Sequence, residues 1–434
     1  MVKKLRYYAR FIVVCLLLKK MKLVRDLVRD LTKQVEDYTS TYEPEDHMEW
    51  SIVLGEIKSF VEAENLVKVS NMDNIPLVLS HRLSLMNMPP MENISMGHLS
   101  LQEILIIGNC SEQVKFSELT LDMFRMLQTL EREPQEDIGQ MYDASPAPGR
   151  VPFENGDHPL KRDNPHKYLL YRPTFSQFIV FLSSGFKELP PNGALLLYIS
   201  ADSAPPVTKY REDLGYGNGG VVTSNKREIE HCNKRGLSLR EMHCLHPGDL
   251  YPFTRKPLFL IIDSENSYVF QNIPNLFGQP MVALMSAEIT PKHLMDTHHK
   301  GNLFTLFLHS PLTAFCFICK VSGVPITSWE KGRVNVDRFL SEAGRLITRS
   351  RGVDSSYIQF YNDDFLRLLL LRFIFCYVVM KMHKFFKGRS NYPRCYPMLP
   401  ESEILENATL QKCVLDLANL LECRGYFYES GEAD

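Results

Sequence analysis

The sequence has little net charge, no regular cysteine framework and no uninterrupted apolar run long enough to cross a membrane. The formal net charge of the 434 residues is −2, which argues against a protein that coats nucleic acid with its whole surface but leaves room for local basic patches. The ten cysteines are scattered along the chain. Because short, regular spacing is the mark of a disulfide scaffold, we expect a reducing compartment.

Two apolar stretches resemble membrane signals but are interrupted by charge. The run at 11–18 is followed directly by two lysines and lacks a small-residue cleavage site. The run at 365–380 contains Arg367 and Arg372, which divide it into pieces shorter than the roughly 20 residues a bilayer requires. We therefore expect two buried helices and no membrane contact. Buried arginines need partners, and Asp363 is one helical turn before Arg367.

No nucleophile elbow, zincin motif, P-loop or kinase signature is present. We therefore expect no enzyme, no cofactor and no small-molecule substrate. A lone Cys-x-x-Cys at 316–319 lacks the second ligand pair of a zinc site, which favours cysteines in the core. The glycine-rich stretch 215–220 lacks a strand before it and a helix after it, so we interpret it as a loop.

Two further motifs allow two interpretations each. Asp263 and Ser267 follow an apolar strand in a pattern that could hold Mg²⁺, although a helix cap is the simpler interpretation. The Leu-x-x-Leu-Leu strings at 366–370 and 417–421 could dock into a partner's groove. Leucines at this spacing more often face their own core, which is the interpretation we favour. We expect no metal.

The N-terminal part, residues 1–133, is predicted to be helical with a small hairpin. Apolar residues recur at three-to-four spacing through 2–64 and predict three helices, while 66–79 has the pattern of a hairpin. Ten Lys and Arg within 1–33 are followed by nine acids within 34–64, which indicates complementary helix faces. Ser117 is a plausible cap for a further helix.

Residues 134–165 are rich in proline and poor in large apolar residues, which predicts a disordered linker. Residues 166–434 then have the pattern of a helix-rich α/β domain. Short apolar runs predict buried strands, the last two parallel and joined by a crossover helix over 264–279. The predicted strands are 194–200, 257–263 and 280–286, and the predicted helices are 175–187, 301–322, 330–350, 354–388 and 407–421. The fold class is therefore mixed α and β, with a small parallel sheet wrapped by helices.

A basic-aromatic segment near the end of the chain is a candidate for single-stranded DNA. Cations that follow phosphates and rings that stack on bases suit a single strand. The predicted contacts are Lys381, Lys384, Lys387, Arg389 and Tyr392. Phe385 and Phe386 cannot both face the lysines on a helix, so at least one belongs to the core. The alternative is a helix C-terminus where cations are favoured by the dipole.

Several long blocks resemble the SCAI family, the suppressor of cancer cell invasion proteins. They include RYYARFIVVCLLL (6–18), QVKFSELTLDMFRMLQTLEREP (113–134), NPHKYLLYRPTFSQ (164–177) and FLRLLLLRFIFC (365–376). The resemblance extends over essentially the whole chain. Members of the family usually carry further helices ahead of the block that matches 6–18.

The resemblance implies a regulator of the nucleus and cytoplasm without catalysis. Its expected partners are myocardin-related coactivators of serum response factor, which such a corepressor inhibits downstream of Rho and actin. It also implies a role in DNA-damage repair through chromatin repair factors and single-stranded DNA. A single-stranded DNA-binding genome-maintenance factor is the alternative function, and the two can coexist.

Overall fold

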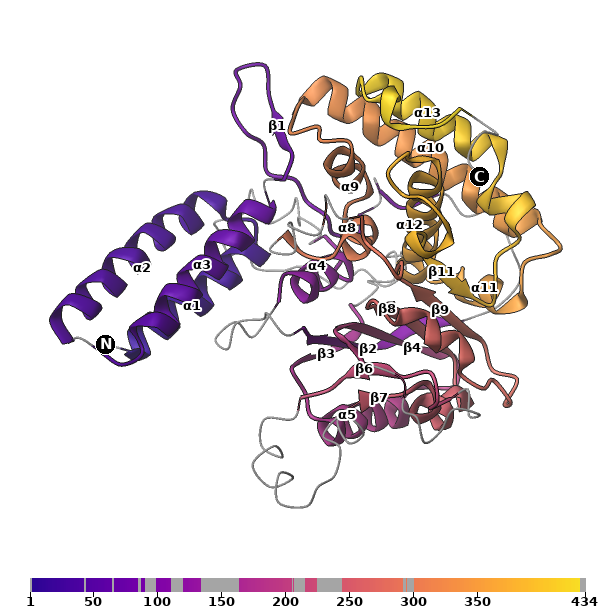
Figure 1. Cartoon of the computed structure of the whole chain (residues 1–434), viewed down its shortest axis with the longest axis horizontal. Helices are drawn as coiled ribbons and strands as arrows, with labels where there is room; N and C mark the ends of the chain where they lie inside the picture. Colours follow the sequence, from indigo (N-terminus) through magenta and orange to yellow (C-terminus); the bar gives the residue numbers. More distant parts are fainter. Residues whose placement is uncertain are drawn as a thin grey trace, which may run out of the picture.

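The computed structural model has a central sheet with helices on both faces and a three-helix arm to one side (Figure 1). It describes residues 2–429 except 43, 65, 85–86, 90–98, 111–119, 134–163, 205, 207–214, 225–243, 292–293 and 295–299. The cap predicted at Ser117 and the predicted linker, except for 164–165, lie outside the described residues. The mixed α and β fold class is confirmed. No helix in the described part of the chain is long and apolar enough to cross a membrane.

The arm consists of the three predicted helices. They are α1 (Val2–Leu17), α2 (Met21–Tyr42) and α3 (His47–Glu64). Their buried faces form a core of their own, which includes Ile12, Leu31 and Trp50. Phe124 of α4 (Leu121–Thr129) belongs to this core too, so the arm is joined to the rest of the molecule by apolar packing. The N-cap of α4 is Thr120.

The central sheet has the order β11-β9-β8-β4-β2-β3. Its strands are β2 (Ser100–Asn109), β3 (His166–Tyr171), β4 (Gly193–Ala201), β8 (Leu258–Asp263), β9 (Met281–Met285) and β11 (Arg394–Tyr396). All neighbouring pairs are parallel except β11 with β9. The predicted strands and their parallel direction are confirmed.

The position of β2 bears on the predicted division of the chain, which stays a prediction. Residues 100–109 lie before the segment 134–165, yet β2 pairs with β3 and β4, which follow that segment. The predicted parts 1–133 and 166–434 therefore share one sheet. The reason is physical: seven of the ten β2 residues form a continuous buried run, and such a run requires cover on both faces, which the helical arm does not provide.

Alternating side chains of the sheet enter two cores. Ile104, Leu196 and Phe259 face the helices of the C-terminal half, whereas Leu105, Leu195 and Leu260 face α5 (Phe175–Glu188). The crossover helix predicted for 264–279 is wrong. That connection contains only the short 3-10 helix η3 (Ser267–Asn272), because the prolines and glycine that follow it prevent a longer helix.

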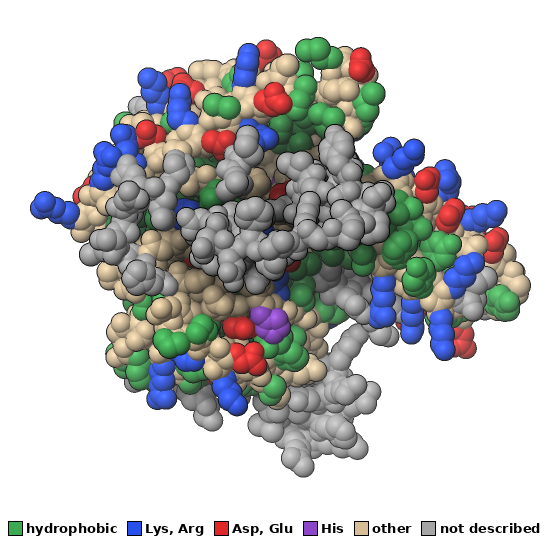
Figure 2. Space-filling model, turned by 180° about the vertical axis from the view of Figure 1, so that it is seen from behind, with side chains coloured by type: hydrophobic (Ala, Val, Ile, Leu, Met, Phe, Trp, Pro, Cys, Tyr) green, Lys and Arg blue, Asp and Glu red, His purple; other side chains and the backbone are tan. Residues whose placement is uncertain are grey.

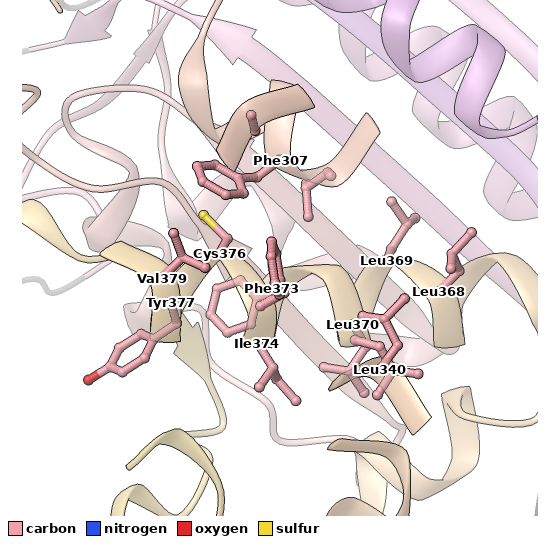
Figure 3. Close-up of a cluster of buried hydrophobic side chains, with 14 of the residues drawn as sticks. Phe307, Leu340, Leu368, Leu369, Leu370, Phe373, Ile374, Cys376, Tyr377 and Val379 are labelled. Atoms are coloured by element: carbon pink, nitrogen blue, oxygen red, sulfur yellow. The ribbon is translucent and has the colours of Figure 1, made fainter. Parts of the chain in front are cut away.

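The helices of the C-terminal half include one whose residues are all buried except Lys381. They are α8 (Leu303–His309), α9 (Pro311–Ile318), α10 (Ile326–Arg349), α11 (Ser355–Phe360), α12 (Asp364–Met382) and α13 (Ala408–Leu420). The predicted helix 301–322 is divided at Pro311, and 354–388 is divided before α12. Figure 3 shows side chains of α12 directed both toward Phe307 of α8 and toward Leu340 of α10.

The two arginines inside α12 are paired, as predicted, but with other groups than expected. Arg367 forms an ion pair of 2.9 Å with Asp364, not Asp363. Asp363 instead caps α12 and accepts a hydrogen bond from the backbone N–H of Leu101, at the start of β2. Arg372 donates to backbone carbonyls of α8. The apolar run is therefore a buried helix, and both of its arginines have hydrogen-bond partners inside the protein.

The predicted hairpin at 66–79 forms only in part. Ser70 and Pro76 make an isolated antiparallel bridge around the turn. β1 (Lys68–Ser70) pairs instead in parallel with β10 (Gly323–Pro325), far along the chain.

Candidate functional site

The predicted basic-aromatic segment lies at the end of α12 and in the turn after it. Three of its cations are engaged by the protein itself. Lys381 and Arg389 form ion pairs with Glu406 and Glu401, and the Lys384 ammonium donates to the Gly425 carbonyl at 2.9 Å. Phosphates would have to compete with these partners.

The aromatic residues of this segment divide between core and surface. Phe386 is buried, which confirms that at least one of the two phenylalanines is a core residue, and Phe385 is exposed. Tyr392 is only 8% exposed and donates its hydroxyl to the Phe386 carbonyl. Its ring packs 5.9 Å from that of Tyr377. Tyr392 is therefore held in the interior, and stacking on a base would require it to move. A nucleic-acid role for Lys381, Lys384, Lys387, Arg389 and Tyr392 stays a prediction.

A second basic-aromatic surface, which was not predicted from the sequence, lies on α1. Lys3, Arg6 and Arg10 are exposed there beside Tyr7 and Phe11, whose rings stack at 5.7 Å with planes 14° apart. Tyr7 is 62% exposed. Together with Val14 these side chains line a groove of about 410 Å³. We call this set of six residues the α1 surface.

The basic character continues around the turn from α1 to α2. A groove of about 520 Å³ there is lined by Lys19, Lys20, Lys22 and Arg25, with Asp26 as its acid. Figure 2 shows Lys and Arg side chains standing in a row along the arm. The signal in the sequence was the run of ten cations within 1–33. We interpreted that run as complementary helix faces, and the structure exposes much of it.

The described residues also form a cleft of about 760 Å³ at the carboxyl ends of the parallel strands. Its floor contains Asp263, at the end of β8, and Asp122, in the first turn of α4. Both carboxylates hold the start of α8. Asp263 accepts from the backbone N–H and the hydroxyl of Thr305, at 3.1 and 2.6 Å, and Asp122 accepts from the backbone N–H of Asn302. Burial and the nearby charge of Asp122 raise the pKa of Asp263 to about 7.

The proposed Mg²⁺ turn is not assembled in this arrangement. The hydroxyl of Ser267 donates to the Ser286 carbonyl at 2.8 Å, and the Asp263 carboxylate is occupied by Thr305. The two side chains thus serve separate structural bonds. Neither Ser264 nor Asp263 caps a helix at this point, because the N-cap of η3 is Asn266.

Within the described residues, one group of potential metal ligands converges. Glu103 of β2, His166 of β3 and Glu188 of α5 place their ligand atoms within 4.8 Å of one another. His166 and Glu103 form an ion pair of 3.0 Å. Burial raises the pKa of the Glu103 carboxyl. The sequence contained no signal for this group, because the three residues lie on separate elements without a local motif.

The remaining motifs are core segments or a loop, as expected. Cys316 and Cys319 are buried. The leucines of the string at 366–370 are fully buried on α12, and Leu417 is buried on α13. The glycine-rich stretch 215–220 leads into the strand β6 (Gly220–Val222), so it is a loop and not a phosphate-binding turn.

Comparison with known proteins places the chain in a family. The model of the family described as Protein SCAI matches residues 1–386. Human Protein SCAI is 51% identical over 99% of this chain and 70% of its own length, and the mouse protein is 50% identical over 100% and 71%. The Protein SCAI homolog of Dictyostelium discoideum is 31% identical over 98% of this chain and 75% of its own length. The chain therefore belongs to the SCAI family.

Proposed function

We propose that this protein is a non-enzymatic adaptor and transcriptional corepressor of the nucleus and cytoplasm. In this role it inhibits myocardin-related coactivators of serum response factor and supports DNA-damage repair. The observation that carries the proposal is the identity of about half over nearly the whole chain with human and mouse SCAI proteins. At that identity the relatives are expected to share the fold of this chain.

The architecture is consistent with an adaptor. The helical arm and the sheet-centred body present surfaces of different charge on one framework, and buried helices and strands hold those surfaces in place. Binding surfaces on such a framework need no catalytic groups, since recognition depends on shape and charge.

A reporter driven by serum response factor tests the corepressor function. Cells depleted of their own SCAI protein should show raised reporter activity, and expression of this chain should lower it. Co-precipitation of a myocardin-related coactivator with the tagged chain should accompany the effect. Full expression without repression and without co-precipitation would refute the corepressor proposal.

A second function, binding of single-stranded DNA, is favoured by the α1 surface. Exposed cations flank a stacked aromatic pair there, of which Tyr7 is exposed and Phe11 half-buried. Cations beside an accessible ring are the combination that follows phosphates and stacks on bases. The segment at 381–392 is the competing site, and most of its cations interact within the protein, as do Arg6 and Arg10 of the α1 surface.

Fluorescence anisotropy with labelled oligo-dT distinguishes the two sites. We expect Lys3→Glu/Arg10→Glu to weaken binding at least tenfold and to flatten its salt dependence, because fewer counterions are released. Lys384→Glu/Lys387→Glu tests the other site. The matched control is Lys331→Glu/Lys412→Glu, which reverses two exposed cations on α10 and α13. Equal affinity in all four proteins would remove both sites from consideration.

A further inference from the structure

The cleft lies at the point where the order of the parallel strands reverses. After β2 the chain first adds β3 on one side and then returns to add β4, β8 and β9 on the other. In open α/β sheets, ligands bind outside the carboxyl ends of the strands at such a reversal. Cys110 and Asp202 follow β2 and β4 directly and both line the cleft. The fold therefore places an accessible hollow where this class of sheet holds its ligands.

The described residues that line the cleft carry charge of one sign only. Its described lining includes five carboxylates and no Lys, Arg or His. The five acids are Glu56, Asp122, Asp202, Asp263 and Glu265. A cleft lined by one sign of charge with low-dielectric walls concentrates the opposite charge. Arg125, which lies against Gly301, pairs with Asp122, and the remaining acids of the lining favour a cationic ligand.

The arrangement of the acids disfavours a bare metal ion. They come from α3, α4 and two strand ends, and Asp122 and Asp263 are committed to backbone N–H groups of the α8 start. Among the described residues, ligand atoms converge closely enough for a metal at Glu103, His166 and Glu188, and this group lies outside the cleft lining.

Apolar side chains form the rest of the cleft wall. Phe60 of α3, Leu121 of α4 and Leu303 and Phe304 of α8 contribute to it. A Lys or Arg side chain matches both features, because its methylene stem packs on apolar surface while its charged head pairs with carboxylates. The volume of about 760 Å³ is within the range of ligand sites and accommodates more than one such side chain.

We propose that this cleft binds a basic peptide segment of a partner protein through its Lys or Arg side chains. This proposal rests on the adaptor function proposed above and gives the chemistry of one partner. Its test uses purified protein, so a failure here is distinguishable from a failure of the reporter experiment. The cleft and the α1 surface would then recognise opposite charges.

The test measures binding of a fluorescein-labelled (Ala-Arg)₄ peptide by anisotropy, with (Ala-Gln)₄ as the neutral peptide. We expect the purified chain to bind the basic peptide and not the neutral one. Asp202→Asn/Glu265→Gln should weaken binding at least tenfold. Both residues line the cleft, and Glu265 is exposed. The matched control Glu62→Gln/Glu330→Gln removes two exposed carboxylates outside the cleft lining and should bind as the unmodified chain does.

Several outcomes would overturn the proposal. They are no binding of the basic peptide, equal affinity in all three proteins, and an equal loss in the control. Displacement of the peptide by stoichiometric Mn²⁺ would identify the cleft as a metal site instead. Self-association that the cleft variant abolishes, measured by sedimentation, would identify a second copy as the occupant. Thermal melting of each variant establishes that it is folded.

Discussion

Arg372 is the buried charge whose removal has the most calculable effect. It lies in the middle of α12 and is 6% exposed. Its Nη1 donates to the carbonyls of Leu308 and His309, at 2.7 and 2.9 Å. These carbonyls end α8, and α9 begins directly afterward with Pro311, which has no N–H to offer them. The guanidinium thus serves as the C-cap of a helix far away in the sequence.

The change in the free energy of unfolding caused by Arg372→Leu follows from two opposing contributions. Two hydrogen bonds from a charged donor contribute about 1.5–3 kcal/mol each, and both carbonyls would remain buried without that donor. Against this, burial lowers the pKa of Arg372 to about 10, with the charge of Asp337 opposing the shift. The net destabilisation of the charged guanidinium is then roughly 3 kcal/mol, which leucine would not incur. The first term exceeds the second, so we expect a net loss of about 2 kcal/mol.

Denaturant unfolding followed by near-ultraviolet circular dichroism measures this loss. Arg345→Leu is the matched control, because Arg345 is exposed on α10 and pairs with Glu342; an exposed pair contributes at most about 1 kcal/mol. Arg372→Lys should fall between the two, since it keeps the charge but not the guanidinium fork. An unchanged or raised unfolding midpoint for Arg372→Leu would show that desolvation outweighs the two hydrogen bonds, and the reasoning would fail.

Three further predictions follow from other parts of the molecule. Limited proteolysis should cut first within 135–163, because the composition there is proline-rich and apolar-poor. The two fragments should co-elute on a native size-exclusion column, because β2 of the first pairs with strands of the second. Separation of the fragments without denaturant would contradict this prediction. Burial holds the pKa of His309 well below 6.5, so as the pH drops the imidazole is protonated in the unfolded chain before it is protonated in the folded one. The melting temperature should therefore fall between pH 7 and pH 5, and the fall should be smaller in His309→Gln. Tyr392→Ala should lower unfolding stability by about 2–4 kcal/mol because its ring is buried, while oligo-dT binding stays unchanged; weaker binding at full stability would restore Tyr392 as a stacking residue.

Local patterns in the sequence were sufficient for most individual elements. The three helices of the arm, the strands β4, β8 and β9 and the buried helix α12 all follow from apolar periodicity and run length. The strand β2 was not predicted. Its apolar run gives no sign of its neighbours, and the chain places it with partners that begin at His166 and Gly193. Pairing between distant segments is a property of the fold and not of a window of sequence.

The candidate surfaces were predictable to different degrees. The cations of the α1 surface are visible as a run within 1–33, but their exposure depends on which face of α1 packs on the other helices. The cleft lining extends from Ile52 to Phe386 and contains no local motif. The burial of Tyr392 was not predictable from its neighbours in the sequence. They include cations at the surface, whereas the ring itself packs inside. Burial at such positions is decided by tertiary contacts.

The pairing of β2 with strands that are synthesised later also has a consequence for the synthesis of the chain. At roughly 5–20 residues per second, the ribosome takes several seconds to proceed from Asn109 to His166, where the first pairing partner begins. During that interval the apolar strand ILII at 104–107 has both edges unpaired. Exposed strands of this kind are where aggregation starts. The nascent protein should therefore depend on chaperones in this window, more than a protein of this size whose paired strands are joined by short connections.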